Sequence, residues 1–150
     1  MQKTLVLLKP DAIQRGLVGE IVSRLEARGL KIVGMKLMKV SRVLAQRHYA
    51  EHEGKPFFGG LVDFITSGPI IAMAMEGNDA ITLVRHTMGA TSPLDSDAGT
   101  IRGDLAVEIG RNLVHGSDSP ESADRELALF FTEDELLSYA RDTDIWITGS

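Results

Sequence analysis

The sequence contains no cysteine among its 150 residues. This absence excludes disulfide bonds, thiol catalysis and the thiolate ligands that structural zinc sites usually need. It also fits the reducing environment of the cytoplasm, where we expect the protein to be located. Long apolar runs are absent as well. The run at residues 5–8 ends at Lys9 and Pro10, so it is too short for a signal peptide or a membrane span, and we expect no membrane partner.

A surplus of positive charge is also missing. The formal net charge is −5, which argues against a broad nucleic-acid-binding surface, so we expect no specific nucleic-acid partner. Neither Gly-x4-Gly-Lys-Ser/Thr nor Gly-x-Gly-x-x-Gly occurs, which excludes a P-loop enzyme. What remains is 43% apolar and 25% charged residues, a composition typical of globular proteins. The length predicts one domain over residues 1–150.

The apolar pattern predicts four β-strands with helices between them. The strands are expected at residues 4–8, 30–40, 70–75 and 113–115. The candidate N-cap residues of the helices are Asp11, Ser41, Asn78 and Ser119. This order predicts an α+β fold of the ferredoxin-like (βαββαβ) type, a four-stranded antiparallel sheet with helices on its surface. The third strand is almost wholly apolar, so we expect it in the centre of the sheet.

Three further segments have distinct patterns. Residues 89–111 are expected to form a long loop with at most a short helix after Thr100, and loops of this length are usually functional. Residues 132–135 have the pattern of a capping box, which predicts that the last helix begins there. The polar tail has an apolar tip at residues 145–147, expected to dock on this chain or on a neighbour.

The run from Gly110 to Ser119 carries the strongest indication of chemistry. In it, two apolar residues bring His115 to the mouth of a loop of small residues. Ser119 and Pro120 then begin a helix. A histidine at a strand end, next to free backbone N–H groups, is well placed to attack or accept a phosphoryl group. The alternative is an exposed histidine in a turn.

His115 needs a group that orients its ring, and the candidate is Glu126. This glutamate lies on the border of the apolar stripe of its helix, where an unpaired buried carboxylate would be costly. Ser117 could hydrogen-bond the carboxylate, and together they would fix the tautomer of the imidazole. The alternative is that Glu126 points into solvent.

A phosphate-binding site needs cations that converge from several elements. The candidates are Lys9 at the end of the first strand, Arg85 late in a helix and Arg102 in the long loop, with Thr91 and Asn112 as possible donors between them. For any one of these cations, a solvated surface position is the alternative.

The pair Phe57-Phe58 stands at a break between two helices. One of the two is expected in the core, and the other could form a platform for a flat ligand. Stacking is worth about 1–3 kcal/mol per base and hardly distinguishes one base from another. His48 and His52 have the spacing of a helical zinc pair, but no third ligand accompanies them, so we predict no metal ligands in this chain.

Taken together, these residues resemble the nucleoside diphosphate kinase family. The resemblance runs from Leu7 to Trp146. Its most specific motif is Asn112-Leu113-Val114-His115-Gly116-Ser117-Asp118. Other motifs agree in order and spacing: Leu7-Leu8-Lys9-Pro10-Asp11, Arg15-Gly16-Leu17-Val18-Gly19-Glu20-Ile21, Pro56-Phe57-Phe58, Ser67-Gly68-Pro69 and Gly99-Thr100-Ile101-Arg102-Gly103-Asp104.

The resemblance implies a two-step transfer of the γ-phosphoryl group of a nucleoside triphosphate to a nucleoside diphosphate, through a phosphohistidine at His115. By position, Lys9 would bind the γ-phosphate and ribose, Tyr49 would lie close to His115, and Asn112 would bind the sugar hydroxyl. Phe57 and Leu61 would hold the base. Arg85, Thr91 and Arg102 would hold the phosphates, and Ser117 and Glu126 would support the histidine. Mg²⁺ would arrive bridging the phosphates of the nucleotide, with few direct protein ligands.

The resemblance also implies assembly into a homo-oligomer, a hexamer or a tetramer. The chain departs from the usual family pattern at Ser92, Ala98 and Leu105, none of which is a catalytic position. Ser92 and Ala98 would soften a loop that packs at subunit contacts. A different hypothesis is a regulatory nucleotide-binding module without catalysis, but such a module would lack the histidine, lysine or arginines, and all are present.

Overall fold

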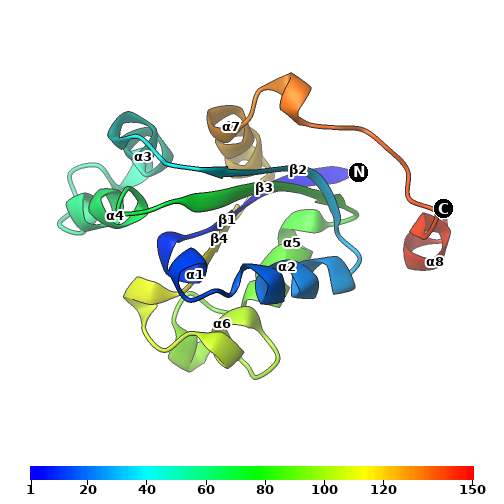
Figure 1. Ribbon diagram of the computed structural model, residues 1–150, viewed down its shortest axis with the longest axis horizontal. Helices are drawn as coiled ribbons and strands as arrows, with labels where there is room; N and C mark the ends of the chain where they lie inside the picture. Colours follow the sequence, from blue (N-terminus) through cyan, green and yellow to red (C-terminus); the bar gives the residue numbers. More distant parts are fainter.

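The computed structural model describes residues 1–150 and contains a four-stranded antiparallel sheet with helices on both faces (Figure 1). The strand order is β2-β3-β1-β4, and every neighbouring pair is antiparallel. The prediction of an α+β fold of the ferredoxin-like type is confirmed. The strands are β1 (Gln2–Leu8), β2 (Lys31–Met38), β3 (Ile70–Gly77) and β4 (Val114–Gly116).

The two central strands are apolar over residues 5–8 and 70–75 because helices cover both faces of the sheet there. In β1, Val6 and Leu8 belong to one core cluster, whereas Leu5 and Leu7 belong to a second cluster on the opposite face. All four side chains are fully buried. In a strand that is buried on both sides, apolar residues do not alternate with polar ones. The third predicted strand, β3, lies between β2 and β1, as expected.

The helices divide between the two faces, as Figure 1 shows. On one face lie α3 (Arg42–His48), α4 (Phe58–Ile65) and α7 (Pro120–Phe130). On the other lie α1 (Pro10–Gln14), α2 (Val18–Ala27), α5 (Ala80–Met88) and α6 (Ile101–Leu105). The 3-10 turns are η1 (Ala50–His52), η2 (Pro93–Asp95), η3 (Ile109–Arg111) and η4 (Glu133–Glu135). The short helix predicted after Thr100 is α6. None of the helices has the length and apolar content that a membrane crossing requires.

Two of the predicted helix caps are confirmed and two are wrong. Ser41 caps α3 and Ser119 caps α7, each by accepting a hydrogen bond from a backbone N–H three residues on. Asp11 instead lies inside α1, and its carboxylate accepts a bond from the backbone N–H of Leu113 at 3.0 Å. At α5, the N–H of Ile81 donates to the Gln2 side chain, not to Asn78. In both failures a residue far along the chain replaces the local partner.

The predicted last helix is also wrong. The capping box at residues 132–135 forms, but only the single turn η4 follows it. The chain then runs along the outer edge of β2, where the Leu137 N–H donates to the Val33 carbonyl at 2.8 Å. Backbone bonding to an open sheet edge replaces helix growth here.

The tail ends in α8 (Asp144–Thr148) and docks on this chain only in part. The Arg141 side chain donates to the Gly29 carbonyl at 3.0 Å, and Ile147 packs so closely on Gly29 that a β-carbon there would lie 2.8 Å from it. Trp146 remains 87% exposed. The prediction of a docked apolar tip therefore holds for Ile147 but not, within this chain, for Trp146.

Candidate active site

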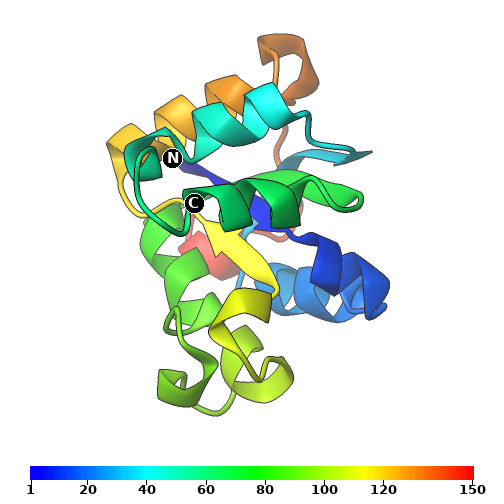
Figure 2. The ribbon, with the colours of Figure 1, turned by 90° about the vertical axis from the view of Figure 1, so that its left-hand side faces the viewer.

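A cavity of about 620 Å³ lies where the loop of residues 89–112 approaches α3, α4 and β4. Figure 2 views the molecule from this side. All the predicted site residues except Ser117 line the cavity: Lys9, Tyr49, Phe57, Leu61, Arg85, Thr91, Arg102, Asn112, His115 and Glu126. The fold thus gathers residues that are spread over most of the sequence.

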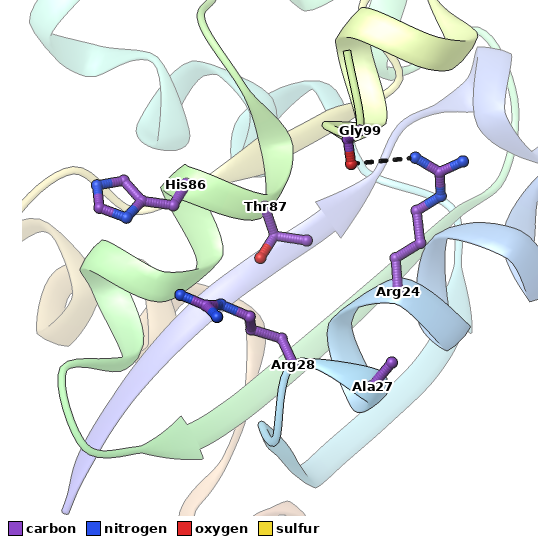
Figure 3. Close-up of a pocket in the computed structure, with 6 residues that line it drawn as sticks. All are labelled: Arg24, Ala27, Arg28, His86, Thr87 and Gly99. Atoms are coloured by element: carbon purple, nitrogen blue, oxygen red, sulfur yellow. Dashed lines mark hydrogen bonds between the residues drawn. The ribbon is translucent and has the colours of Figure 1, made fainter. Parts of the chain in front are cut away.

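A second cavity, of about 450 Å³, lies between α2 and α5 (Figure 3). Arg24, Arg28, His86 and Thr87 contribute to its lining. The guanidinium group of Arg24 is already neutralised, because Glu20 lies 2.9 Å and Asp104 2.7 Å from it. None of the predicted site residues reaches this cavity, so the larger one is the candidate active site.

The backbone before His115 is tightly bent. Leu113 has a φ of 74°, and the Val114 N–H donates to the Asn112 carbonyl at 2.9 Å, which closes a γ-turn around Leu113. Such a conformation costs a non-glycine residue about 1–3 kcal/mol and persists only where its surroundings enforce it. Here the side chain of Leu113 is fully buried and its N–H is held by Asp11.

His115 follows on β4, opposite Leu7 of β1. Residues paired across two strands point to the same face of a sheet. Leu7 packs into the core beneath α3, α4 and α7, so His115 also points toward those helices.

A buried carboxylate holds the far side of the His115 ring. Nε2 of His115 lies 2.9 Å from Oε1 of Glu126, and the Ser117 hydroxyl donates to the same oxygen at 2.6 Å. The Leu5 N–H in turn donates to the Ser117 oxygen at 3.3 Å. Glu126 is only 5% exposed, so the alternative that it points into solvent is wrong.

This contact fixes the tautomer of His115. A carboxylate can only accept hydrogen bonds, so Nε2 carries the proton and the neutral ring has its lone pair on Nδ1. Burial alone would raise the pKa of Glu126, but the hydrogen bond and the charge of His115, with a further hydrogen bond from Ser117, outweigh burial and lower that pKa to about 2. The carboxylate is therefore ionised near neutral pH.

Three cations line the cavity without a carboxylate partner. Lys9 donates to the Asn112 side chain, and Arg85 donates to the Gly116 carbonyl at 3.0 Å. Arg102 donates to three backbone carbonyls, those of Gly89, Asn112 and Val114. None of the three cations forms a salt bridge with any residue of the chain, so this part of the cavity carries an uncompensated positive charge.

Burial makes two of these cations less basic. Desolvation, with a smaller contribution from Arg102, lowers the pKa of Lys9 to about 8. Desolvation, together with the charge of Arg85, lowers the pKa of Arg102 to about 10. Both shifts have the sign expected of buried positive groups, and the opposing charge of Asp11 does not reverse the shift of Lys9.

The two aromatic residues at the helix break separate as expected. Phe58 packs against the core beneath α4, whereas Phe57 is 51% exposed at the cavity. The His52 ring supports Phe57 from the side, with a centroid distance of 5.2 Å. Leu61 and Ile109 also line the cavity, so its lining combines apolar side chains with the cations.

Comparison with known proteins identifies the family. The family model described as nucleoside diphosphate kinase matches residues 2–136, most of the chain. The chain belongs to the nucleoside diphosphate kinase family.

Individual relatives agree over the full length. A nucleoside diphosphate kinase from Carboxydothermus hydrogenoformans is 60% identical over 147 residues, which span 98% of this chain and 99% of that protein. The structure of a halophilic nucleoside diphosphate kinase from Halobacterium salinarum in complex with CDP is 55% identical, covers 97% of both chains and has a TM-score of 0.95. A family member from Babesia bovis is 46% identical, with a TM-score of 0.95 and coverage of 98% of this chain and 99% of that one.

In this member of the nucleoside diphosphate kinase family, a residue that the sequence did not assign to the site lies against His115. His48, at the end of α3, packs edge-to-face against His115 with a centroid distance of 4.7 Å and an interplanar angle of 84°. Its spacing to His52 resembles a zinc pair, and no local pattern points to His115. A contact between residues 67 positions apart leaves no local trace in a sequence.

His48, His115 and Glu126 are also the one group that could hold a metal, because their ligand atoms all lie within 4.8 Å of one another. Glu126 already accepts two hydrogen bonds, and Arg125 lies 3.7 Å from its second oxygen. The charges of Arg125 and Lys9 both act to keep His48 unprotonated, so they oppose a cation at this point as well. We therefore assign no metal to this group.

The positions that depart from the nucleoside diphosphate kinase pattern lie outside the cavity. Ser92 precedes the turn η2, Ala98 is exposed, and Leu105 packs against the core beneath α6.

Proposed function

We propose that this protein transfers the γ-phosphoryl group of a nucleoside triphosphate, typically ATP, to a nucleoside diphosphate through a phosphohistidine at His115. The observation that carries the proposal is an imidazole, held through Nε2 by a buried carboxylate, in a cavity whose three cations form no salt bridge. Membership of the nucleoside diphosphate kinase family and the CDP complex of the Halobacterium relative support it.

The first half of the reaction forms a P–N bond. The lone pair on Nδ1 of His115 attacks the γ-phosphorus, the bond from that phosphorus to the β-bridging oxygen breaks, and the nucleoside diphosphate leaves with the electron pair. The ring becomes positively charged, and the ionised Glu126 at Nε2 stabilises that charge. In the second half, a terminal oxygen of another nucleoside diphosphate attacks the phosphorus and the P–N bond breaks.

The other residues bind and orient the nucleotide. Phosphoryl transfer depends mainly on position and charge neutralisation, which Lys9, Arg85 and Arg102, with Thr91, would supply to the phosphates. Asn112, joined to Lys9 by a hydrogen bond, would bind the sugar hydroxyl. Tyr49 lies beside His48 and would limit the space around the nucleophile.

The base would lie in the slot formed by Phe57 and Leu61. Every base has a flat face to stack on an aromatic ring, so this mode of binding supports broad base specificity.

The acidic residues of the cavity are few. Glu126 is already bonded to His115 and Ser117, which leaves only Glu51 and Asp118. This donor set fits a Mg²⁺ ion held mainly by the phosphates of the nucleotide. When bound, the ion would neutralise part of the phosphate charge.

Residues 1–150 would act as one domain within a homo-oligomer, a hexamer or a tetramer. Several large apolar side chains at the surface support assembly, namely Leu94, Val107, Ile109 and Trp146. The cytoplasmic location and the absence of a specific nucleic-acid partner stay predictions from composition.

The test is to mix the protein with γ-labelled ATP alone and quench in alkali. We expect one label per active chain that survives alkali, is released by acid and maps to His115. His115→Ala should lower turnover about 10⁴-fold or more while ADP binding persists. His86→Ala, at an exposed histidine outside the cavity, is the matched control and should behave as wild type. A His115→Ala protein with normal turnover would refute the mechanism.

A further inference from the structure

His48 is a buried imidazole that the proposed reaction does not use. Its side chain is 3% exposed, and neither ring nitrogen has a hydrogen-bond partner. A neutral imidazole always carries one N–H, and leaving such a group unpaired inside a protein costs about 1–3 kcal/mol. A residue kept at this cost, in direct contact with the nucleophile, calls for an explanation.

We propose that His48 is a positioning residue that holds the His115 ring at the angle from which Nδ1 faces the bound nucleotide. This inference rests on the proposed function, because it assigns to His48 a role in phosphorylation of His115.

The first argument is geometric. The hydrogen bond from Nε2 to Glu126 fixes one atom of the His115 ring but leaves the ring free to swing about that contact. The edge-to-face contact with His48 adds a second constraint, because an interplanar angle of 84° sets the tilt of the ring. Errors of about 1 Å in the placement of a reacting group can cost about 100-fold in rate.

The second argument concerns what holds His48 itself. Its ring packs against Tyr49 at 4.7 Å and against Phe130 at 5.4 Å, both edge-to-face. These contacts come from the end of α3 and from α7, two elements fixed by the core beneath them. His48 therefore transmits the rigidity of that core to the ring on the short strand β4.

The third argument is electrostatic. Burial and the neighbouring His115 lower the pKa of His48 to about 3, although Glu126 acts in the opposite direction. A neutral His48 does not compete with His115 for the charge of Glu126. A neutral aromatic ring at position 48 also suits this contact better than a charged side chain would, because the positive edge of one aromatic ring is attracted to the face of another.

The experiment compares wild type with His48→Phe, His48→Leu and His48→Ala. Phe keeps a flat ring edge, Leu fills similar volume without one, and Ala leaves a cavity. The measurements are the single-turnover rate of His115 phosphorylation by ATP, the Kd for ADP, and the ¹⁵N NMR signature of the His115 tautomer. We expect Phe to be within about threefold of wild type and Leu and Ala to be slower by about 10-fold or more, all with an unchanged Kd. We also expect the ¹⁵N signals of the His115 ring to broaden in Leu and Ala only, without a change of tautomer, because Glu126 still fixes the tautomer.

If His48→Leu were phosphorylated as fast as wild type, the positioning role would be overturned. A His48→Phe variant as slow as His48→Ala would overturn it too. The Leu variant keeps the volume of the site, so the test does not depend on the folding of the Ala variant. Failure of the wild-type protein to label at His115 would instead refute the proposed function, and the NMR comparison would still test the effect of His48 on the ring.

Discussion

The two sides of His115 are built differently. Behind the ring, Glu126, Ser117 and His48 are buried, and Glu126 has two donors on one oxygen. In front of it, Lys9 and Arg102 donate only to neutral groups. The rear side is complete without a ligand, whereas the cations of the front have no salt-bridge partner. On the proposed function, the protein would thus fix its nucleophile in advance and leave it to the nucleotide to neutralise the front.

The largest effect is expected from Glu126→Gln, which tests the buried contacts behind the His115 ring. The folded-state pKa of Glu126, about 2, lies below the ordinary value of 4.5. The resulting stability is fully present above pH 4.5 and is lost as the pH falls through about 2, and it amounts to about 3 kcal/mol.

Urea unfolding at pH 7 should show this loss in Glu126→Gln, and the gap to wild type should narrow below pH 4.5. Asp124→Asn, at an exposed carboxylate on the same helix, should change stability little at either pH. A gap that does not change with pH would contradict the ionic role of Glu126.

A comparison of Arg102 with Arg85 separates the contribution of a cavity cation to stability from its contribution to ligand binding. A lysine at position 102 keeps the charge, but its single ammonium group cannot reach three carbonyls as the guanidinium does. Arg102→Lys should therefore destabilise the protein by about 2 kcal/mol. Arg85→Lys, which loses only the bond to Gly116, should unfold close to wild type. Equal effects of the two substitutions on the midpoint of thermal unfolding would show that the carbonyl bonds contribute nothing.

Phe57 tests whether the front distinguishes bases. Phe57→Ala should weaken the binding of the adenosine, guanosine, cytidine and uridine diphosphates by similar factors of about 5 to 100. Calorimetric titrations with all four would measure this, with Val43→Ala as a control at an exposed apolar residue outside the cavity. A preference for one base in wild type that disappears in the variant would contradict base-blind stacking.

The smallest expected effect concerns Lys9, which should take up a fraction of a proton when ADP binds. Its pKa of about 8 means that about half of the free protein is unprotonated at Lys9 at pH 8. A bound phosphate raises that pKa, so ADP binding at pH 8 should take up about half a proton, and binding at pH 6.5 almost none.

Titrations in two buffers of different ionisation enthalpy measure this proton uptake. It should vanish in Lys9→Gln and persist in Lys39→Gln, which alters an exposed lysine outside the cavity. Uptake that persists without Lys9 would assign the proton to another group.

Local patterns predicted what local forces determine. Ser119 and Pro120 begin α7 as expected, and the apolar run of β3 lies in the centre of the sheet. The border position of Glu126 on its helix correctly marked it as a carboxylate in need of a partner, because the stripe beside it must be buried.

The failures share one cause, which is a partner distant in sequence. The Gln2 side chain took the place of Asn78 at α5, and the edge of β2 took up the chain after residue 135. The contact of His48 with His115 was not predicted for the same reason. Tertiary contacts of this kind decide between alternatives that are locally equal, so a single sequence does not reveal them.

The γ-turn at Leu113 lets two residues that are an odd number of positions apart face the same cavity. Asn112 and His115 are separated by three positions, an odd number, and in an extended strand such residues face opposite sides. Both nonetheless line the cavity. The tight bend between them takes up the extra half-period, so one insertion or deletion at this point would turn either the Asn112 amide or the His115 imidazole away from the cavity. The length of this short segment is therefore as strictly required as the identity of its histidine.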